Sequence, residues 1–467
     1  MVTASVPAVV IAAPASGSGK TTVATGLMGA LRAAGRRVAP FKVGPDYIDP
    51  GYHALATGLP GRNLDAVMVG ARRIGPLFGH GTAGCDIAIV EGVMGLFDGK
   101  IDMSGAGAAS AEGSTAAVAA MLGAPVVLVV DARGHSQSLA AVLHGFSTFD
   151  SSVRIGGVIL NRVGSPRHEE VLRQACERVG VPVLGSLPRM AELAVPSRHL
   201  GLITALEHGG RARSAVDAMA ELVRTHVDLG AIEALARSAV TDTAWDAEDE
   251  VGGRHDGSPV VAIAGGPAFT FGYAEHVELL RASGAEVAVF DPLTDALPEH
   301  TAGVVIPGGF PEEHAEALAA NTALLSGVRD AASRGIPIHA ECAGLLYLAR
   351  NLDGHAMAGV IDADARFGSV LTLGYRDAVA LETSVLFEAG QRVTGHEFHR
   401  TMLVDSDGAH SAPAWGWRRT GPGAGVVREG FVQGGVHASY LHTHPAGNPR
   451  SIGRFVSACA RYCSLDA

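Results

Sequence analysis

Near its start the chain has an apolar strand, a loop of small residues and a lysine that opens a helix. The strand is expected over 7–13 and the helix over 20–35. In such a loop the backbone N–H groups point into one concavity, and the helix N-terminus adds its dipole. The pattern predicts a nucleoside triphosphate site with the lysine on the terminal phosphates and a threonine hydroxyl on Mg²⁺. The residues expected to form this site are Gly17, Ser18, Gly19, Lys20, Thr21 and Thr22.

The loop departs from the usual phosphate-loop pattern at its entry. Pro14 lies near the position of the first glycine, and that position is itself not glycine. A proline fixes one φ angle and removes an N–H, so the entry differs while the phosphate-facing end is kept. The alternative, a Gly/Ser-rich turn that happens to precede a lysine, fits the flanking strand and helix patterns less well.

Composition narrows the class of protein. The 467 residues are 47% hydrophobic and 18% charged, include 61 glycines and carry a net charge of −11. This length predicts two or three domains, and the acidic balance argues against nucleic acid as a partner. No segment is apolar and long enough to suggest a membrane span, so we expect a cytoplasmic protein. The odd number of cysteines at irregular spacing suits a reducing compartment: Cys85, Cys176, Cys342, Cys459 and Cys463.

Apolar runs alternate with helical patterns along both halves of the chain. Because these runs are apolar throughout, they predict parallel strands covered by helices on both faces, in two doubly wound α/β domains. We expect domains at 1–237 and 259–467, joined by an exposed linker at 238–258. Strands are expected at 7–13, 37–43, 86–91, 125–131, 155–161, 182–185, 260–264, 286–290, 303–306 and 336–340. Helices are expected at 20–35, 113–123, 136–146, 167–179, 273–283 and around 213–237.

Charged side chains follow several strands of the first half. Lys42 lies at the end of one strand, Asp46 and Asp49 stand in the proline-bounded loop after it, and Glu91 ends another. Ligands of open α/β sheets bind at this carboxyl edge, and Mg²⁺ prefers hard oxygen ligands. We therefore expect a metal and substrate site here, with Asp98 its least secure member. Taken singly, each acid is more commonly a cap or a solvated charge.

Asn161 ends the strand 155–161. Its amide offers both a donor and an acceptor to a purine edge. An ordinary turn asparagine is an equal alternative from the residues alone.

Cys342 follows a strand and precedes a helical pattern in the second half. A cysteine at a sharp strand-to-helix turn exposes its sulfur, and the helix N-terminus stabilises the thiolate. Gly308 and Gly309 end an upstream strand, and their N–H groups could form an oxyanion hole. These parts predict acyl transfer through a thioester. The base is left open among His396, His399, His437, His442 and His444.

The rival interpretations of the cysteines are a zinc site and a buried apolar side chain. Cys342 has no second cysteine nearby, which argues against zinc. We interpret the other four, at 85, 176, 459 and 463, as small buried hydrophobes.

Taken together, the motifs resemble the cobyrinic/hydrogenobyrinic acid a,c-diamide synthase family from end to end. The segments that carry the resemblance are 15–22, 42–50, 90–99 and 438–442. The N-terminal half is similar to dethiobiotin synthetase and the C-terminal half to class I glutamine amidotransferases. The resemblance implies a glutamine-hydrolysing carbon–nitrogen ligase of cobalamin biosynthesis that uses ATP and Mg²⁺ to amidate the a and c acetate carboxylates of a corrin through an acyl phosphate.

The resemblance also assigns roles to residues. ATP and metal would meet Lys20, Thr21, Asp46, Asp49 and Glu91, with Lys42 on the transferring phosphoryl group and Asn161 at adenine. Tyr47 and Asp98 would face the corrin. Cys342 would be the nucleophile and His442 the base, with Gly309 at the oxyanion hole. Class I enzymes usually have a glutamate two residues after this histidine, where the chain has His444.

Alternatives remain for the substrate and the assembly. A sibling amidase would act on Ni-sirohydrochlorin or make cobyric acid, and a ParA-like ATPase would leave Cys342 unexplained. The resemblance favours cobalt-free hydrogenobyrinic acid over cobyrinic acid. The oligomeric state stays open, with a homodimer among the alternatives.

Overall fold

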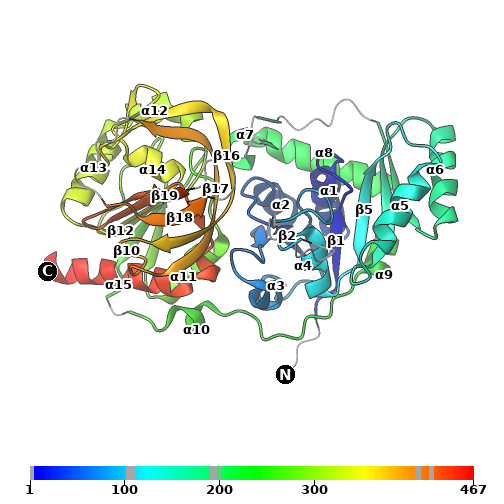
Figure 1. Ribbon diagram of the computed structural model, residues 1–467, viewed down its shortest axis with the longest axis horizontal. Helices are drawn as coiled ribbons and strands as arrows, with labels where there is room; N and C mark the ends of the chain where they lie inside the picture. Colours follow the sequence, from blue (N-terminus) through cyan, green and yellow to red (C-terminus); the bar gives the residue numbers. More distant parts are fainter. Residues whose placement is uncertain are drawn as a thin grey trace. The chain divides into compact units, whose positions relative to one another are not determined.

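The computed structural model describes residues 5–100, 111–189, 197–198, 201–202, 204–255, 257–404, 412–419 and 425–466. The chain divides into two compact units, Met1–Trp245 and Asp246–Ala467, called unit 1 and unit 2 below (Figure 1). The boundary falls inside the expected linker. The predicted domain limits themselves remain a prediction.

Unit 1 is built on a parallel sheet of seven strands in the order β3-β2-β4-β1-β5-β6-β7. Its strands are β1 (Ala8–Ala12), β2 (Val38–Val43), β3 (Arg62–Leu64), β4 (Ile87–Glu91), β5 (Val126–Asp131), β6 (Ile155–Val163) and β7 (Val183–Pro188), beside the short pair β8 (Ser197–Arg198) and β9 (Gly201–Leu202). Its helices are α1 (Lys20–Ala33), α2 (Asp49–Thr57), α3 (Ile74–Gly81), α4 (Thr115–Leu122), α5 (Leu139–Thr148), α6 (Pro166–Arg178), α7 (Ala205–His208), α8 (Gly210–His226) and α9 (Leu229–Leu235), with the 3-10 turn η1 (Ala71–Arg73).

The central strands of unit 1 are buried along their whole length. Every residue of β1, β2 and β4 is buried. Strands covered by helices on both faces need apolar side chains on both faces, which is why these runs do not alternate. On one side α1 packs closely against α8, where glycines of α1 let the two helices approach. The predicted doubly wound architecture of this half is confirmed.

Unit 2 contains a second sheet of this kind, in the order β11-β10-β12-β13-β21-β20. All neighbours in it are parallel except β20 and β21. Its strands are β10 (Val260–Ala264), β11 (Glu286–Phe290), β12 (Thr301–Ile306), β13 (Ile338–Glu341), β20 (Phe431–Gln433) and β21 (Val436–Ser439). Its helices are α10 (Ala247–Val251), α11 (Ala274–Ala282), α12 (Ala315–Ala320), α13 (Thr322–Ser333), α14 (Ala343–Leu348) and α15 (Pro449–Asp466), with 3-10 turns η2 (Pro311–His314) and η3 (Pro445–Gly447). Helix α15, red in Figure 1, packs on β10 and β12.

A further sheet of unit 2 lies outside the expected elements. It is mostly antiparallel and has the order β15-β14-β16-β17-β22, with β18 and β19 attached beside β16. Its strands are β14 (Asn351–Leu352), β15 (His355–Ala356), β16 (Asp364–Ala380), β17 (Arg392–Val404), β18 (Trp415–Arg419), β19 (Gly425–Glu429) and β22 (His442–Thr443). Unit 2 is therefore a parallel-sheet domain with an added antiparallel layer.

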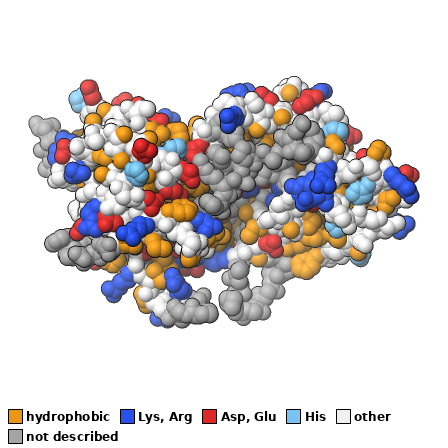
Figure 2. All heavy atoms as spheres, turned by 90° about the horizontal axis from the view of Figure 1, so that it is seen from above, with side chains coloured by type: hydrophobic (Ala, Val, Ile, Leu, Met, Phe, Trp, Pro, Cys, Tyr) orange, Lys and Arg blue, Asp and Glu red, His pale blue; other side chains and the backbone are white. Residues whose placement is uncertain are grey.

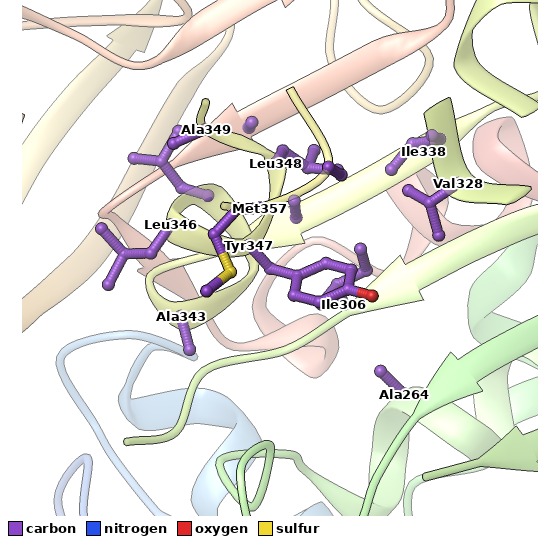
Figure 3. Packing of buried hydrophobic residues seen from close by; sticks show 14 of the residues in the cluster. Ala264, Ile306, Val328, Ile338, Ala343, Leu346, Tyr347, Leu348, Ala349 and Met357 are labelled. Atoms are coloured by element: carbon purple, nitrogen blue, oxygen red, sulfur yellow. The ribbon is translucent and has the colours of Figure 1, made fainter. Parts of the chain in front are cut away.

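The core of unit 2 gathers around α14. All six residues of this helix are buried, as expected for a helix that is apolar all round. Figure 3 shows its side chains between strands and neighbouring helices; the labelled members of the cluster are Ala264, Ile306, Val328, Ile338, Ala343, Leu346, Tyr347, Leu348, Ala349 and Met357. Gly344 lies so close to β12 that an added Cβ would be 2.1 Å from the Ile306 carbonyl oxygen. This packing fixes the residue that precedes the helix.

Three local expectations were wrong. Asp49 begins α2 and does not lie in a loop. The segment 238–258 is not uniformly exposed, because Trp245 and Val251 are buried; Asp256 lies outside the described residues. Cys85 and Cys463 are partly exposed, while Cys176 and Cys459 are buried as expected.

The surface carries both signs of charge. On the face shown in Figure 2, basic, acidic and apolar side chains of the described residues are interspersed. Within the part of the chain that the structure describes, no helix is both long and apolar enough to cross a membrane.

The α1–α8 contact generates a stability prediction. A Cβ at Gly26 would lie 2.5 Å from the Met219 carbonyl oxygen, whereas a Cβ at Gly145 in α5 meets nothing within 4 Å. Gly26→Ala should lower the free energy of unfolding of unit 1 by about 1–3 kcal/mol, because backbone must shift. Gly145→Ala should be neutral or stabilise by up to about 1 kcal/mol. Calorimetry of both full-length variants tests this, and equal stability would contradict the close packing.

Candidate functional site

The loop between β1 and α1 has the backbone of a phosphate-binding loop. Gly17 and Gly19 have φ angles of 78° and 97°, which favour glycine. The Ser18 hydroxyl donates to the Ala15 carbonyl at 2.9 Å and closes the turn. The Lys20 ammonium is buried and donates to the Met94 carbonyl at 2.5 Å, and Thr22 follows in the first turn of α1. The predicted loop, strand and helix therefore occur together.

Two residues of β6 hold this loop from outside. The Asn161 amide donates to the Ser18 carbonyl at 2.9 Å, and Arg162 donates to the Gly17 carbonyl at 2.9 Å. Gly19 combines a φ of 97°, which favours glycine, with a close approach, since an added Cβ would lie 2.2 Å from the Asn161 amide nitrogen and displace it. Asn161 thus braces the loop in this structure, and its contact with adenine stays a prediction.

Behind the loop a lysine is buried between carboxylates. The Lys42 ammonium donates to Asp49 at 2.6 Å and to Glu91 at 3.0 Å, and Asp46 lies 3.7 Å away. Thr21 joins the cluster, donating to Glu91 at 2.7 Å with Asp49 at 3.2 Å. Parallel pairing produces this meeting, because Glu91 is the register partner of both Lys42 and Ile11, which precedes the loop.

Burial and charge act against each other in this cluster. Burial lowers the pKa of Lys42, but the Asp49 and Glu91 carboxylates outweigh it and the pKa is raised. Burial would raise the pKa of Glu91, yet Lys42 and His53 bring it below the usual range. Lys20 has a lowered pKa, because it is buried and faces Lys42. Lys42 and Glu91 are therefore a charged pair at neutral pH, whereas burial and the neighbouring Asp46 carboxylate raise the pKa of Asp49 well above its usual range.

The oxygen atoms of this cluster fit a hard cation. The Thr21 hydroxyl lies within hydrogen-bond distance of both the Asp49 and the Glu91 carboxylates, and a third carboxylate, that of Asp46, lies 3.7 Å from the Lys42 ammonium. Among the described residues no group of three His, Cys, Asp or Glu side chains makes a protein-only metal site. Mg²⁺ commonly keeps water and phosphate ligands, so a nucleotide would complete its coordination.

The two residues expected at the substrate differ in exposure. Tyr47 is buried, whereas Asp98 is exposed and accepts the N–H of Gly95 at 3.0 Å. Asp46 accepts the N–H groups of Ile48 and Asp49, which positions the start of α2. Roles for Tyr47 and Asp98 at the corrin stay predictions.

In unit 2, Cys342 occupies a strained turn between β13 and α14. Its φ of 50° lies in the left-handed region, which a residue with a side chain adopts only where its surroundings impose it. The imposing contacts are a hydrogen bond from its N–H to the Ser439 carbonyl at 2.7 Å and the tight packing of Gly344 described above. The expectation that this turn exposes the sulfur was wrong: Cys342 is only 3% exposed, because the same contacts bury it, and its thiol lies 3.9 Å from the Phe398 carbonyl oxygen.

The glycine pair lies beside one of the candidate histidines. A Cβ at Gly308 would be 2.4 Å from His442 Cε1, and a Cβ at Gly309 would be 2.0 Å from the Ala268 carbonyl oxygen. Phe271 contacts both Gly308 and His442. Its N–H donates to the Gly308 carbonyl at 3.0 Å, and the centre of its ring lies 6.3 Å from that of the His442 ring. Both glycines are needed for these close approaches.

The other histidines have different neighbours. His396 pairs with His442 across β17 and β22 and packs on Tyr375. His399 stacks on Tyr440 with ring centroids 3.8 Å apart, and His437 lies 3.1 Å from the Ser384 hydroxyl. Of the five candidates, His442 lies next to Gly308, and its role as the base stays a prediction.

His444 has contacts typical of a structural residue. Its Nδ1 accepts the N–H of Ala446 at 3.2 Å, and its ring packs 4.1 Å from that of Tyr273. An orienting role for His444 is not tested by these contacts and stays a prediction.

The thiol and imidazole are both neutral before reaction. Burial, with the Glu312 carboxylate second, raises the pKa of the Cys342 thiol far above its ordinary value, so the expected stabilisation of the thiolate was wrong. Burial lowers the pKa of His442 to about 4, although Glu341 opposes the shift. A neutral imidazole is the form that takes a proton from a thiol.

Two residues of these clusters were missed in the sequence. His53 contacts Glu91 at 2.6 Å and is fully buried; its spacing of four from Asp49, on one helix face, is a signal that could have found it. Glu341 lies 3.8 Å from His442, and its position at the carboxyl end of a strand was a comparable signal.

Family models match both halves of the chain. Residues 9–203 match the CobQ/CobB/MinD/ParA nucleotide binding domain, and residues 260–449 match the CobB/CobQ-like glutamine amidotransferase domain. A solved glutamine amidotransferase aligns at a TM-score of only 0.30 and 19% identity, covering 43% of this chain and 98% of that one, which is too distant to support an argument.

Similar proteins span nearly the whole chain. The hydrogenobyrinate a,c-diamide synthase of Mycobacterium bovis is 61% identical over 455 residues, covering 97% of this chain and 98% of the relative. That of Streptomyces coelicolor is 55% identical over 97% and 98% of the two chains. The cobyrinate a,c-diamide synthase of Gloeobacter violaceus is 41% identical over 97% of each. With these identities along both domains, the chain belongs to the hydrogenobyrinate and cobyrinate a,c-diamide synthase family.

Proposed function

We propose that the protein amidates the a and c acetate carboxylates of hydrogenobyrinic acid, using ATP and glutamine, in cobalamin biosynthesis. Relatives at 61%, 55%, 52% and 41% identity carry the hydrogenobyrinate name, whereas two relatives named for cobyrinate are 41% and 40% identical. Five free thiols suit a cytoplasmic, reducing setting. The observation that carries the proposal is the presence of two separate chemistries, a charged cluster behind a phosphate loop and a strained cysteine whose neighbour in the chain, Glu341, lies 3.8 Å from His442.

The nucleotide half would activate the acid. A carboxylate is a poor acceptor for ammonia because its leaving group is poor, and phosphorylation by ATP removes that obstacle. The substrate carboxylate would attack the γ-phosphorus to form an acyl phosphate and release ADP. Lys20, which opens α1, and Lys42, which is buried behind the loop, would supply the positive charge that this transfer needs. Charge stabilisation and positioning contribute most to such transfers.

A metal ion has a suitable donor set in the same cluster. Mg²⁺ would be held by Thr21, Asp49 and Glu91, with Asp46 nearby. When bound, it supplies charge neutralisation for the phosphates. His53 holds the second oxygen of Glu91 at 2.6 Å, so the first oxygen keeps its direction toward Thr21 and Lys42.

The amidotransferase half would supply nitrogen. Cys342 attacks the amide carbon of glutamine, its proton passes to His442, and ammonia leaves with a proton returned by His442. Water then hydrolyses the thioester to glutamate. The N–H groups near Gly308 and Gly309 would face the oxyanion. Ammonia displaces phosphate from the acyl phosphate at the other site.

Two other functions remain as candidates. A sibling amidase would use the same chemistry on another tetrapyrrole, and a ParA-like ATPase would use only the first unit. The matched amidotransferase model over residues 260–449 favours an amidase over the ATPase.

Substrate choice is tested by offering both corrin acids, with and without cobalt, to the purified protein with ATP and glutamine. We expect the a,c-diamide of hydrogenobyrinic acid, identified by mass, to form at the higher kcat/KM. A higher kcat/KM for cobyrinic acid would show that the proposed substrate is wrong. The absence of product from either acid would reject the proposal as a whole.

Replacement of the nucleophile should separate the two nitrogen sources. Cys342→Ala should lower glutamine-dependent amidation more than about 1000-fold, because no thioester forms. Amidation supported by ammonium salts should persist, since the phosphate loop is untouched. Cys463→Ala, a partly exposed cysteine of the same unit, is the control. Retained glutamine use by Cys342→Ala would exclude it as nucleophile.

Loss of the loop lysine should stop synthesis from either source. The chain contains three lysines, at positions 20, 42 and 100. Lys20→Ala should reduce amidation with glutamine and with ammonium alike by about 100-fold or more, because charge stabilisation of the phosphates is lost. Lys100→Ala, whose ammonium lies 3.9 Å from Glu112, should keep near-normal turnover. Near-normal turnover of Lys20→Ala would contradict the phosphate-loop role.

A further inference from the structure

The amidotransferase site lacks the expected carboxylate at residue 444. A catalytic imidazole is usually oriented by an acidic partner that also balances the charge it acquires. His444 provides no carboxylate, and its ring caps η3 at Ala446 and packs on Tyr273. The charge partner of His442 must therefore come from elsewhere.

Glu341 has the required position. It is the last residue of β13, immediately before Cys342, and its Oε2 lies 3.8 Å from His442 Nδ1. The imidazole is fully buried, and the carboxylate is 13% exposed. With the carboxylate at Nδ1, the other ring nitrogen is left for the thiol proton.

The other oxygen of Glu341 is anchored. Oε1 accepts the N–H of Thr443 at 3.2 Å and its hydroxyl at 2.8 Å, and His339 Nε2 lies 3.2 Å away. These contacts hold one carboxylate oxygen while the second faces the imidazole. Because Thr443 follows His442, the anchor also fixes the strand that carries the base.

We propose that Glu341 is the positioning carboxylate of the glutaminase site and replaces the glutamate usually found two residues after the histidine. The inference rests on the proposed function. During thioester formation the Cys342 proton moves to His442, and the imidazolium is balanced by Glu341. When ammonia leaves, His442 returns that proton, so Glu341 stays ionised throughout.

The electrostatics of the site agree with this assignment. Burial opposes ionisation of Glu341, but His339 and His442 bring its pKa down to about 2. Besides Glu341, the ionisable groups of the described residues that face His442 include His396, His399 and Glu397 on β17. Removing the Glu341 charge should therefore lower the pKa of His442 and weaken it as a base.

The test is Glu341→Gln in the full-length protein, which keeps the shape and removes the charge. We expect kcat for glutamine hydrolysis to fall about 100-fold with KM changed less than about threefold, since glutamine itself is still bound. Ammonium-supported amidation should stay within about twofold of wild type. Glu388→Gln, an exposed partner of Arg454 in the same unit, is the matched control, and Glu341→Asp should recover part of the rate.

A pH series separates charge from mere structure. In Glu341→Gln, the rate at which iodoacetamide alkylates Cys342 should fall furthest below the wild-type rate near pH 6–7. At higher pH the two rates should converge, because hydroxide then takes the thiol proton in place of the weakened base. A purely structural defect would lower the rate by one factor at every pH.

The outcomes separate the two proposals. Wild-type protein that hydrolyses no glutamine would reject the proposed function. A wild type that is active, with Glu341→Gln unchanged in kcat and in the pH series, would reject only the role of Glu341. If kcat falls in His444→Asn but not in Glu341→Gln, then His444, and not Glu341, orients the His442 imidazole.

Discussion

The compensation of charge around Lys42 is the interaction on which the nucleotide site depends. An ammonium that is only 3% exposed is tolerated because Asp49 and Glu91 accept from it at 2.6 and 3.0 Å. Removal of one partner of a buried ion pair typically costs about 3–5 kcal/mol. These contacts fix where the Asp49 and Glu91 carboxylates lie relative to the lysine. Such preorganisation is what phosphoryl transfer needs from a protein.

Both units use the same physical device to collect their functional groups. Parallel strands end at one edge of a sheet, so residues distant in sequence meet there. In unit 1 this edge joins the phosphate loop, Lys42 and Glu91. In unit 2 it joins the glycine pair after β12 and Cys342 after β13. The added antiparallel layer of unit 2 then contributes His442, whose strand β22 pairs with β17.

The parts predictable from sequence were those set by local pattern. The strand-loop-lysine order at 7–20 and the strand-cysteine-helix order at 336–348 each specify a backbone geometry without distant information. The antiparallel layer was missed because β16 mixes exposed and buried residues over 17 positions and shows no clean alternation. The register of its pairing with β17 also shifts between Phe367 and Thr372, which interrupts the alternation of buried and exposed residues. The contacts of Asn161 and Glu341 likewise depend on residues more than 100 positions away.

The central claim is that nucleotide energy reaches the corrin by phosphorylation of its carboxylate. The direct measurement uses hydrogenobyrinic acid labelled with ¹⁸O in its carboxylates, together with ATP and glutamine, and mass analysis of the inorganic phosphate released. The account predicts one ¹⁸O atom in phosphate for each amide formed. Unlabelled phosphate alongside normal diamide formation would contradict it.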